Sequence, residues 1–309
     1  MSIDALKINK INYISKYAIK RIPSVEQENI VIDIDNLQID SMYKPYLREF
    51  INKTSNFNFR NINKTLETLN ITNIKFPESL LKVKEGDYSI IENKIRIRKD
   101  KIDSLYHELF HAFTSWREDS AIGCGFYQED LGYNIGSSLD EGYTDLLFND
   151  IFNSEINYTV EANIANKLQL ILTKEKMQEM YTSNNLIDIV EFLSQYSSKQ
   201  ESVSFIILMD KLDKYNYENK KTIRLMNILS NYLVDVFVNV LVEFYSQGKF
   251  DKEDINIFFS IFKEEFTKYA FYNDDIEKEY LRSSDYLDIT SKLSNGYFQK
   301  QLAIRKTCY

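Results

Sequence analysis

The chain of 309 residues has little of several residue types, with 2 Cys, 2 His, 3 Pro and 8 Gly. Two cysteines are too few for a disulfide framework, which favours a reducing compartment over secretion. Basic residues are also outnumbered, because 38 Lys+Arg stand against 46 Asp+Glu and leave a formal charge of −8. Nucleic acids and anionic membranes attract basic surfaces, so we expect neither as the main partner.

Long apolar runs are scarce as well. Residues 1–20 alternate Lys with Ile and Tyr and lack the uninterrupted apolar core of a signal peptide. The most apolar stretch, 232–245, is interrupted by Asp235, Asn239 and Glu243 and is too short to span a bilayer. These features predict a soluble, cytoplasmic protein that does not enter a membrane, and they leave the oligomeric state open.

The prolines divide the chain, because all three lie within the first 77 residues. Everything after them can run as helix without a proline break. We therefore expect an α+β fold that is predominantly α, with a mixed region over 1–153 and a helical region over 154–309 packed against it. Apolar residues recur at helical spacing from about Tyr158 onward, which favours a helical bundle there.

The mixed region shows weaker periodicities. Helices are predicted near 42–51 and 63–69, and short β-branched runs predict strands at 30–34 and 71–76. A clearer pattern is the pair of runs at 88–91 and 95–98, which predicts a hairpin. Asn93 lies between them and can take the positive φ that a tight turn requires.

Five of the eight glycines lie within one window of 20 residues, at Gly123, Gly125, Gly132, Gly136 and Gly142. Most of the chain's backbone freedom is therefore concentrated there. In a protein poor in glycine, such a window predicts a loop that shapes a site.

The only two histidines, His107 and His111, frame the sequence His-Glu-Leu-Phe-His. Residues four apart on a helix share one face, so both imidazoles can bind a single metal ion. Glu108 between them can then act as a base on a water that the metal activates.

A helix is predicted across this motif, with Asp100 as its cap and Asp103 in its first turn. The histidines point to nearly the opposite side from an apolar stripe made of Ile102, Leu105, Leu109, Ala112, Phe113 and Trp116. The alternative is that both histidines lie on the surface of an amphipathic helix and bind nothing.

A catalytic zinc site normally has three protein ligands, and no third histidine exists here. Glu141 is the strongest candidate, since it shares one face of a predicted helix with Asp145. Asp145 can then accept a hydrogen bond from a ligating imidazole. Two alternatives stay open: Glu141 in a capping box with Ser138, and Cys124, flanked by glycines, as the ligand.

This arrangement resembles the gluzincin group of zinc metallopeptidases, the thermolysin-like class, over about residues 88–150. Members of that group carry His-Glu-x-x-His on one helix and Glu-x-x-x-Asp on a later one. The matching residues here are His107, Glu108, His111, Glu141 and Asp145. The resemblance implies a zincin-like catalytic core that binds peptide along an edge strand.

Two departures from the group are visible. Asp140 stands where the group commonly has Asn, which leaves the local hydrogen bonding open. The group also uses a further histidine to stabilise the oxyanion, and this chain has none. A tyrosine hydroxyl could replace it, and the candidates are Tyr127, Tyr133 and Tyr143.

The sequence therefore predicts a peptidase that holds one Zn2+ ion through His107, His111 and Glu141, with Glu108 as general base. A peptide or protein substrate would lie along the strand at 95–98. The basic residues around that strand could favour acidic substrates, or could only protect an exposed edge from aggregation: Lys94, Arg96, Arg98, Lys99 and Lys101. The rival interpretations are a protein with structural zinc whose helical region binds a partner, and a zinc hydrolase of a non-peptide amide.

Overall fold

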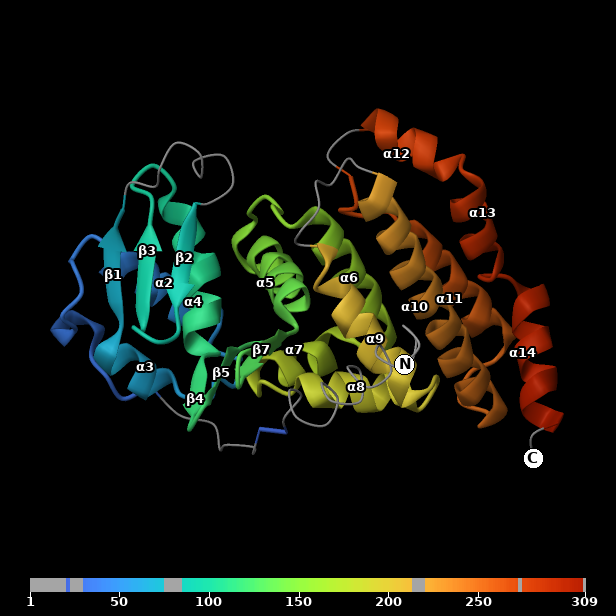
Figure 1. Cartoon of the computed structure of the whole chain (residues 1–309), viewed down its shortest axis with the longest axis horizontal. Coiled ribbons are helices and arrows are strands. Elements are labelled where there is room, and N and C mark those ends of the chain that lie inside the picture. Colours follow the sequence, from blue (N-terminus) through green and yellow to red (C-terminus); the bar gives the residue numbers. More distant parts are fainter. Residues whose placement is uncertain (1–20, 23–29, 75–84, 213–219, 272–273, 308–309) are drawn as a thin grey trace, which may run out of the picture.

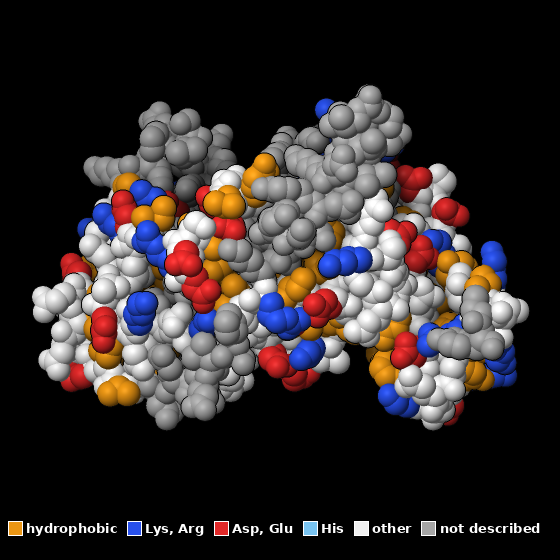
Figure 2. Space-filling model, turned by 60° about the horizontal axis from the view of Figure 1, so that its bottom comes forward, with side chains coloured by type: hydrophobic (Ala, Val, Ile, Leu, Met, Phe, Trp, Pro, Cys, Tyr) orange, Lys and Arg blue, Asp and Glu red, His pale blue; other side chains and the backbone are white. Residues whose placement is uncertain are grey.

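The structure is a computed structural model that describes residues 21–22, 30–74, 85–212, 220–271 and 274–307 (Figure 1). The described chain is mostly helical and contains two small sheets, so the predicted class, α+β and predominantly α, is confirmed. The first sheet lies at one end of the molecule, the second extends from there toward the middle, and the helices of the C-terminal region form the other end (Figure 1). Figure 2 shows acidic and basic side chains interspersed over the face that it presents.

The first sheet has the order β1-β3-β2 and is built from β1 (Asn70–Asn73), β2 (Gly86–Ser89) and β3 (Lys94–Ile97). The predicted hairpin is confirmed, because β2 and β3 pair in antiparallel fashion around Asn93, whose φ is 46°. The prediction that the strand at 95–98 lies at the edge of its sheet is wrong. β3 is central, since β1 pairs with its other side, and β2 is the outer strand of the hairpin.

Helices α2 (Lys44–Lys53) and α3 (Ile62–Thr68) confirm the two helices predicted before the hairpin. β1 confirms the start of the strand predicted at 71–76, whose last two residues lie outside the described chain. The strand predicted at 30–34 is wrong, because a short 3-10 helix (Ile34–Asn36) forms there instead. Asp33 caps this helix by accepting a hydrogen bond from the Asp35 backbone, and such local bonds compete with strand pairing.

Helix α4 (Leu105–Phe113) carries the histidine motif and is shorter than predicted. A 3-10 helix (Ile102–Ser104) precedes it, and Asp100 forms an ion pair with Arg98 instead of capping it. Trp116 lies beyond its end, in β4. Every residue of α4 is buried, with His107 8% exposed and His111 6% exposed, so the surface-histidine alternative is wrong.

The glycine-rich window does not form the predicted loop. Its first part, together with the residues just before it, folds into an antiparallel sheet of four strands in chain order: β4 (Trp116–Glu118), β5 (Ala121–Cys124), β6 (Tyr127–Asp130) and β7 (Tyr133–Ile135). Gly125, in the turn between β5 and β6, has a φ of +47°. A Cβ atom there would lie 2.0 Å from Asp140 Oδ1, so glycine lets this turn approach the helix that follows the sheet.

Ten helices make up the rest of the described chain: α5 (Ser137–Phe152), α6 (Thr159–Leu172), α7 (Lys174–Thr182), α8 (Leu186–Ser194), α9 (Lys199–Met209), α10 (Lys220–Ser246), α11 (Lys252–Glu264), α12 (Asp274–Leu281), α13 (Ser284–Ser291) and α14 (Asn295–Thr307). The predicted boundary after residue 153 falls between α5 and α6, which pack closely together. One continuous apolar core contains side chains from both predicted regions.

Helix α10 is long and apolar enough to span a membrane by length and composition, with a mean hydropathy of 1.6. The apolar stretch 232–245 that the sequence singles out lies in the C-terminal half of this helix. In the fold, 67% of its most apolar window is buried, and the helix packs against α6, α9, α13 and α14. It serves as the central helix of the C-terminal region (Figure 1).

The contact between α5 and α6 depends on a residue without a side chain. A Cβ atom on Gly142 would lie 2.4 Å from the carbonyl carbon of Glu161 and 2.6 Å from its oxygen. Those atoms belong to the α6 backbone and cannot rotate away. Glycine therefore sets the distance between α6 and the helix that carries Glu141.

We expect Gly142→Ala to lower the free energy of unfolding by about 1–3 kcal/mol, because the added methyl group forces the two helices apart. The matched control is Gly296→Ala in α14, where a Cβ atom has no heavy atom within 4 Å. That change should alter stability by less than about 1 kcal/mol, in the favourable direction. Chemical denaturation measures both, and equal effects would contradict this account of the contact.

Candidate functional site

Helices α4 and α5 bring three of the predicted ligand side chains together. His107 Nε2 lies 3.1 Å from Glu141 Oε2 and 3.0 Å from His111 Nε2, and His111 Nε2 lies 3.4 Å from Glu141 Oε2. The two histidines are one turn apart on α4, and Glu141 faces them from the first turns of α5. Three potential ligand atoms therefore converge on one point.

The Nδ1 atom of each imidazole, on the side of the ring away from the three convergent atoms, faces a buried aspartate. His107 Nδ1 lies 2.9 Å from Asp145 Oδ1, and His111 Nδ1 lies 3.1 Å from Asp140 Oδ2. Each carboxylate favours a proton on the nitrogen beside it, so the lone pair of the neutral ring is on Nε2. The sequence placed Asp145 in this role for a ligating imidazole. Asp140 has the equivalent position toward His111, which the sequence does not indicate.

Both aspartates are held by backbone groups. Asp145 Oδ2 accepts hydrogen bonds of 2.7 Å from the backbone N–H groups of Asn157 and Tyr158, just before α6. Asp140 Oδ1 accepts one of 2.9 Å from the backbone of Phe126, in the turn between β5 and β6. The imidazoles are therefore oriented by groups that cannot rotate freely.

The geometry of the three convergent atoms fits a metal ion. Nitrogen and oxygen ligands 2.0–2.1 Å from one tetrahedral ion lie about 3.3 Å apart. The observed separations run from 3.0 to 3.4 Å. The Glu141 side chain keeps 28% of its surface exposed, so the site opens to solvent beside this carboxylate. His107, His111 and Glu141 can thus hold one ion.

The electrostatics of the site also favour positive charge at this point. Desolvation lowers the pKa of His107, but its bonds with Asp145 and Glu141 outweigh this and raise the pKa to about 10. Desolvation raises the pKa of Glu141, but the charges of His111 and His107 and their hydrogen bonds hold it well below its usual value. A cation among these atoms replaces protons that the side chains otherwise retain.

Glu108 lies next to the ligands and is 7% exposed. Desolvation raises the pKa of its carboxyl group to about 7, against the opposing charges of the two histidines. The outer strand β2 covers this carboxylate, because a Cβ atom on Gly86 would lie 3.1 Å from Glu108 Oε1. The Glu108 carboxylate thus lies between helix α4 and strand β2.

Cys124 is buried beside the site but on the other side of the imidazole. Its Sγ atom lies 3.8 Å from His111 Nδ1 and 3.4 Å from Asp140 Oδ2. The Nε2 atom, which faces His107 and Glu141, is on the opposite edge of the His111 ring. Cys124 therefore contacts the groups that orient His111 and does not join the three convergent atoms.

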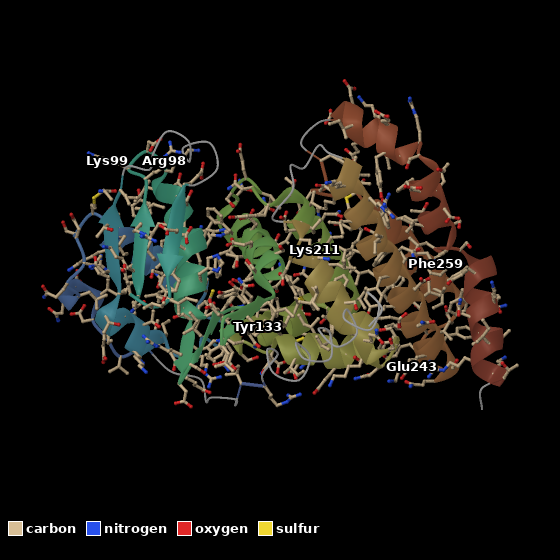
Figure 3. The ribbon with its side chains drawn as sticks, viewed as in Figure 1. Arg98, Lys99, Tyr133, Lys211, Glu243 and Phe259 are labelled. Atoms are coloured by element: carbon tan, nitrogen blue, oxygen red, sulfur yellow. The ribbon has the colours of Figure 1, made fainter. Side chains whose placement is uncertain are left out.

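The three tyrosines predicted as oxyanion partners lie in different surroundings. The Tyr127 hydroxyl donates a hydrogen bond of 2.6 Å to Glu129, and Tyr133 is 43% exposed on β7 (Figure 3). Tyr143 is fully buried, and its ring packs against Tyr181 with centroids 5.2 Å apart. Their role toward an oxyanion stays a prediction.

Tyr158 is an aromatic neighbour of the site that the sequence pattern did not indicate. Its ring stacks on His107, with centroids 6.1 Å apart and planes inclined by 22°. It lies 13 residues after Asp145, beyond the range of any helical spacing with the motif. Only the turn from α5 back to α6 brings it there.

The interpretation of Glu141 as part of a capping box with Ser138 is wrong. The N-cap of α5 is Gly136, with a φ of +85°, and no side chain of α5 caps it. Asp210, at the end of α9, accepts hydrogen bonds from the backbone N–H groups of Gly136 at 2.8 Å and Ser138 at 3.1 Å. Glu141 is therefore free to face the histidines, and a residue of the C-terminal region anchors its helix.

The basic residues predicted to flank a substrate are largely neutralised. Arg96 pairs with Asp87, Arg98 pairs with Asp100 at 2.5 Å, and Lys101 pairs with Glu85 at 2.6 Å. Such pairs leave little net positive charge for a ligand. The interpretation of this flank as a site for acidic substrates is therefore not supported.

We expect the purified protein to bind about one equivalent of a divalent metal ion per chain. Glu141→Gln should remove most of it, because a neutral amide is a poor ligand, and Asp145→Ala should weaken binding by about 10–100-fold. Cys124→Ser, the matched control, should retain the metal. Elemental analysis after dialysis measures all three, and retention in Glu141→Gln with loss in Cys124→Ser would overturn this ligand set.

Comparison of the chain with protein-family models, with curated proteins and with solved structures gives no match in any of the three. The chemistry of the site must therefore be inferred from the side chains themselves.

Proposed function

We propose that the protein is a zinc-dependent metallopeptidase with a gluzincin-like site in a zincin-like core. The observation that carries this proposal is the convergence of His107 Nε2, His111 Nε2 and Glu141 Oε2 at 3.0–3.4 Å, with a carboxylate behind each imidazole. Two imidazoles and one carboxylate form the donor set typical of catalytic zinc. Zinc, when bound, supplies a Lewis acid that activates water and polarises the scissile carbonyl group.

Glu108 acts as the general base in this proposal. Its carboxylate takes a proton from the attacking water and passes it to the leaving amine. A base with a pKa near neutrality can do both, and desolvation raises the pKa of Glu108 to about 7. His107 and His111 remain oriented throughout by Asp145 and Asp140.

The substrate lies along β2 in this proposal. β2 pairs only with β3 among the strands that the structure describes, so its other edge can accept an extended peptide. Gly86 brings that strand against Glu108, which places the general base beside a peptide bound there. The same geometry suits an enzyme that acts on peptides or unfolded segments.

We expect Glu108→Gln to lower the rate of peptide hydrolysis by about 10²–10⁴-fold and to retain the zinc, because the amide cannot accept the proton. Mass spectrometry of a mixed peptide library measures the cleavage. Glu92→Gln, in the exposed turn of the hairpin, is the matched control and should leave turnover unchanged. Unchanged turnover in Glu108→Gln would overturn the mechanism, and cleavage confined to small non-peptide amides would favour the alternative substrate class.

Gly86→Ala tests the approach of β2 to the general base. The new methyl group would lie 2.8 Å from Ile97 Cδ1 and 3.1 Å from Glu108 Oε1, so the glutamate must shift. We expect turnover to fall by about tenfold or more with zinc content unchanged, since small displacements of a catalytic group are costly. Gly296→Ala serves as control, and full activity of Gly86→Ala would show that this contact does not position Glu108.

A further inference from the structure

A cavity of about 420 Å³ opens where the hairpin of the first sheet ends. Its walls come from α3, from the turn that joins β2 to β3, and from the start of β4. Apolar and polar side chains share the lining, among them Tyr88 and Trp116. This cavity is separate from the three convergent ligand atoms.

Basic side chains outnumber acidic ones around this cavity, with Arg60, Lys64 and Arg117 against Glu118. Arg60 and Glu118 form an ion pair at 3.5 Å. Lys64 and Arg117 are exposed and have no ion-pair partner within 4.0 Å in the part of the chain that the structure describes. A cavity with net positive charge is unusual in a chain with a formal charge of −8.

The polar wall beneath these cations is held by its own hydrogen bonds. The Tyr88 hydroxyl lies 3.0 Å from Asn93 Oδ1 and 2.9 Å from Ser115 Oγ. Asn93 Nδ2 donates to the Thr65 carbonyl oxygen at 2.8 Å. The wall is therefore preorganised, and an entering group can interact with the cations without first breaking it.

The cavity lies along the strand that the proposed function assigns to the substrate. Gly86, at the start of β2, abuts Glu108, and Tyr88 and Ile90 line the cavity two and four residues further along. An extended chain rises about 3.3 Å per residue. Tyr88 therefore lies roughly 7 Å from Gly86 and Ile90 roughly 13 Å from it, and the cavity covers this distance along the chain. A peptide on the β2 edge reaches it with residues two to four positions from the bond beside Glu108.

We propose that this cavity binds a carboxylate group of the substrate, so that the preferred peptides carry Asp or Glu two to four residues from the cleaved bond. Carboxylates suit guanidinium and ammonium groups, which bind them through charge-assisted hydrogen bonds. The position of the acidic residue relative to the cleaved bond rests on the proposed peptidase function. The binding of a carboxylate in the cavity is independent of that function.

Binding can be measured without any catalysis, because Trp116 is the only tryptophan of the chain and lines the cavity. We expect capped tri-glutamate to cause a saturable change in tryptophan fluorescence, and capped tri-glutamine to cause none at the same concentrations. Lys64→Glu and Arg117→Glu should each weaken the affinity for tri-glutamate at least tenfold. Both residues are exposed, so the folded state should survive, and thermal unfolding confirms this.

Lys99→Glu is the matched control. Lys99 is exposed and lies at the far end of β3 from the turn that borders the cavity (Figure 3). The same reversal of charge there should leave the affinity unchanged. An equal loss in Lys99→Glu, no saturable change with tri-glutamate, or tighter binding of inorganic phosphate than of tri-glutamate would each overturn the proposal.

A cleavage assay separates this inference from the proposed function. Peptides with a single Glu moved through successive positions should be cut fastest when it lies two to four residues from the bond, and Arg117→Glu should abolish that preference. Cleavage without any such preference would overturn the proposed preference for acidic peptides and leave the proposed peptidase function standing. Saturable binding of tri-glutamate without cleavage of any peptide would support the carboxylate site and contradict the peptidase.

Discussion

The contact between α4 and α5 is the interaction on which the site depends. It brings two imidazole nitrogens and one carboxylate oxygen within 3.4 Å of one another, in surroundings that exclude most water. Electron-rich atoms at such distances repel each other unless a cation or protons lie between them. The carboxylates of Asp140 and Asp145 add to the negative potential. The packing of these helices therefore favours positive charge at this point, which either protons or a bound metal ion can supply.

The rest of the fold keeps α5 in this position. Gly142 lets the α6 backbone lie against it, and Asp210 caps its first turn from the end of α9. Asp145 ties the middle of α5 to the start of α6 through two backbone hydrogen bonds. The C-terminal region thus contributes to the geometry of the site even though it provides none of the three convergent atoms.

The first sheet completes the arrangement on the other side. Its outer strand, β2, has an edge next to Glu108 that pairs with no other strand in the described residues, and the turn after β2 borders a cavity lined by more basic than acidic side chains. An extended peptide can form backbone hydrogen bonds with the β2 edge, and an acidic side chain can bind the basic side chains of the cavity. In the proposed function, the general base, the strand edge that binds the peptide backbone and the cavity that binds an acidic side chain therefore follow one another along β2.

The sequence by itself determined the helical spacing of His107 and His111, the candidacy of Glu141 and Asp145, the hairpin around Asn93 and the predominance of helix, because each follows from local periodicity or from the types of residue available. It could not determine which strand of the hairpin is at the edge, since β1 joins the sheet from elsewhere in the chain. It also could not indicate that Asp210 caps α5, that the glycine-rich window forms a sheet, or that Tyr158 stacks on His107. These features depend on contacts between residues far apart or on competing local structures, and only the tertiary structure decides among them.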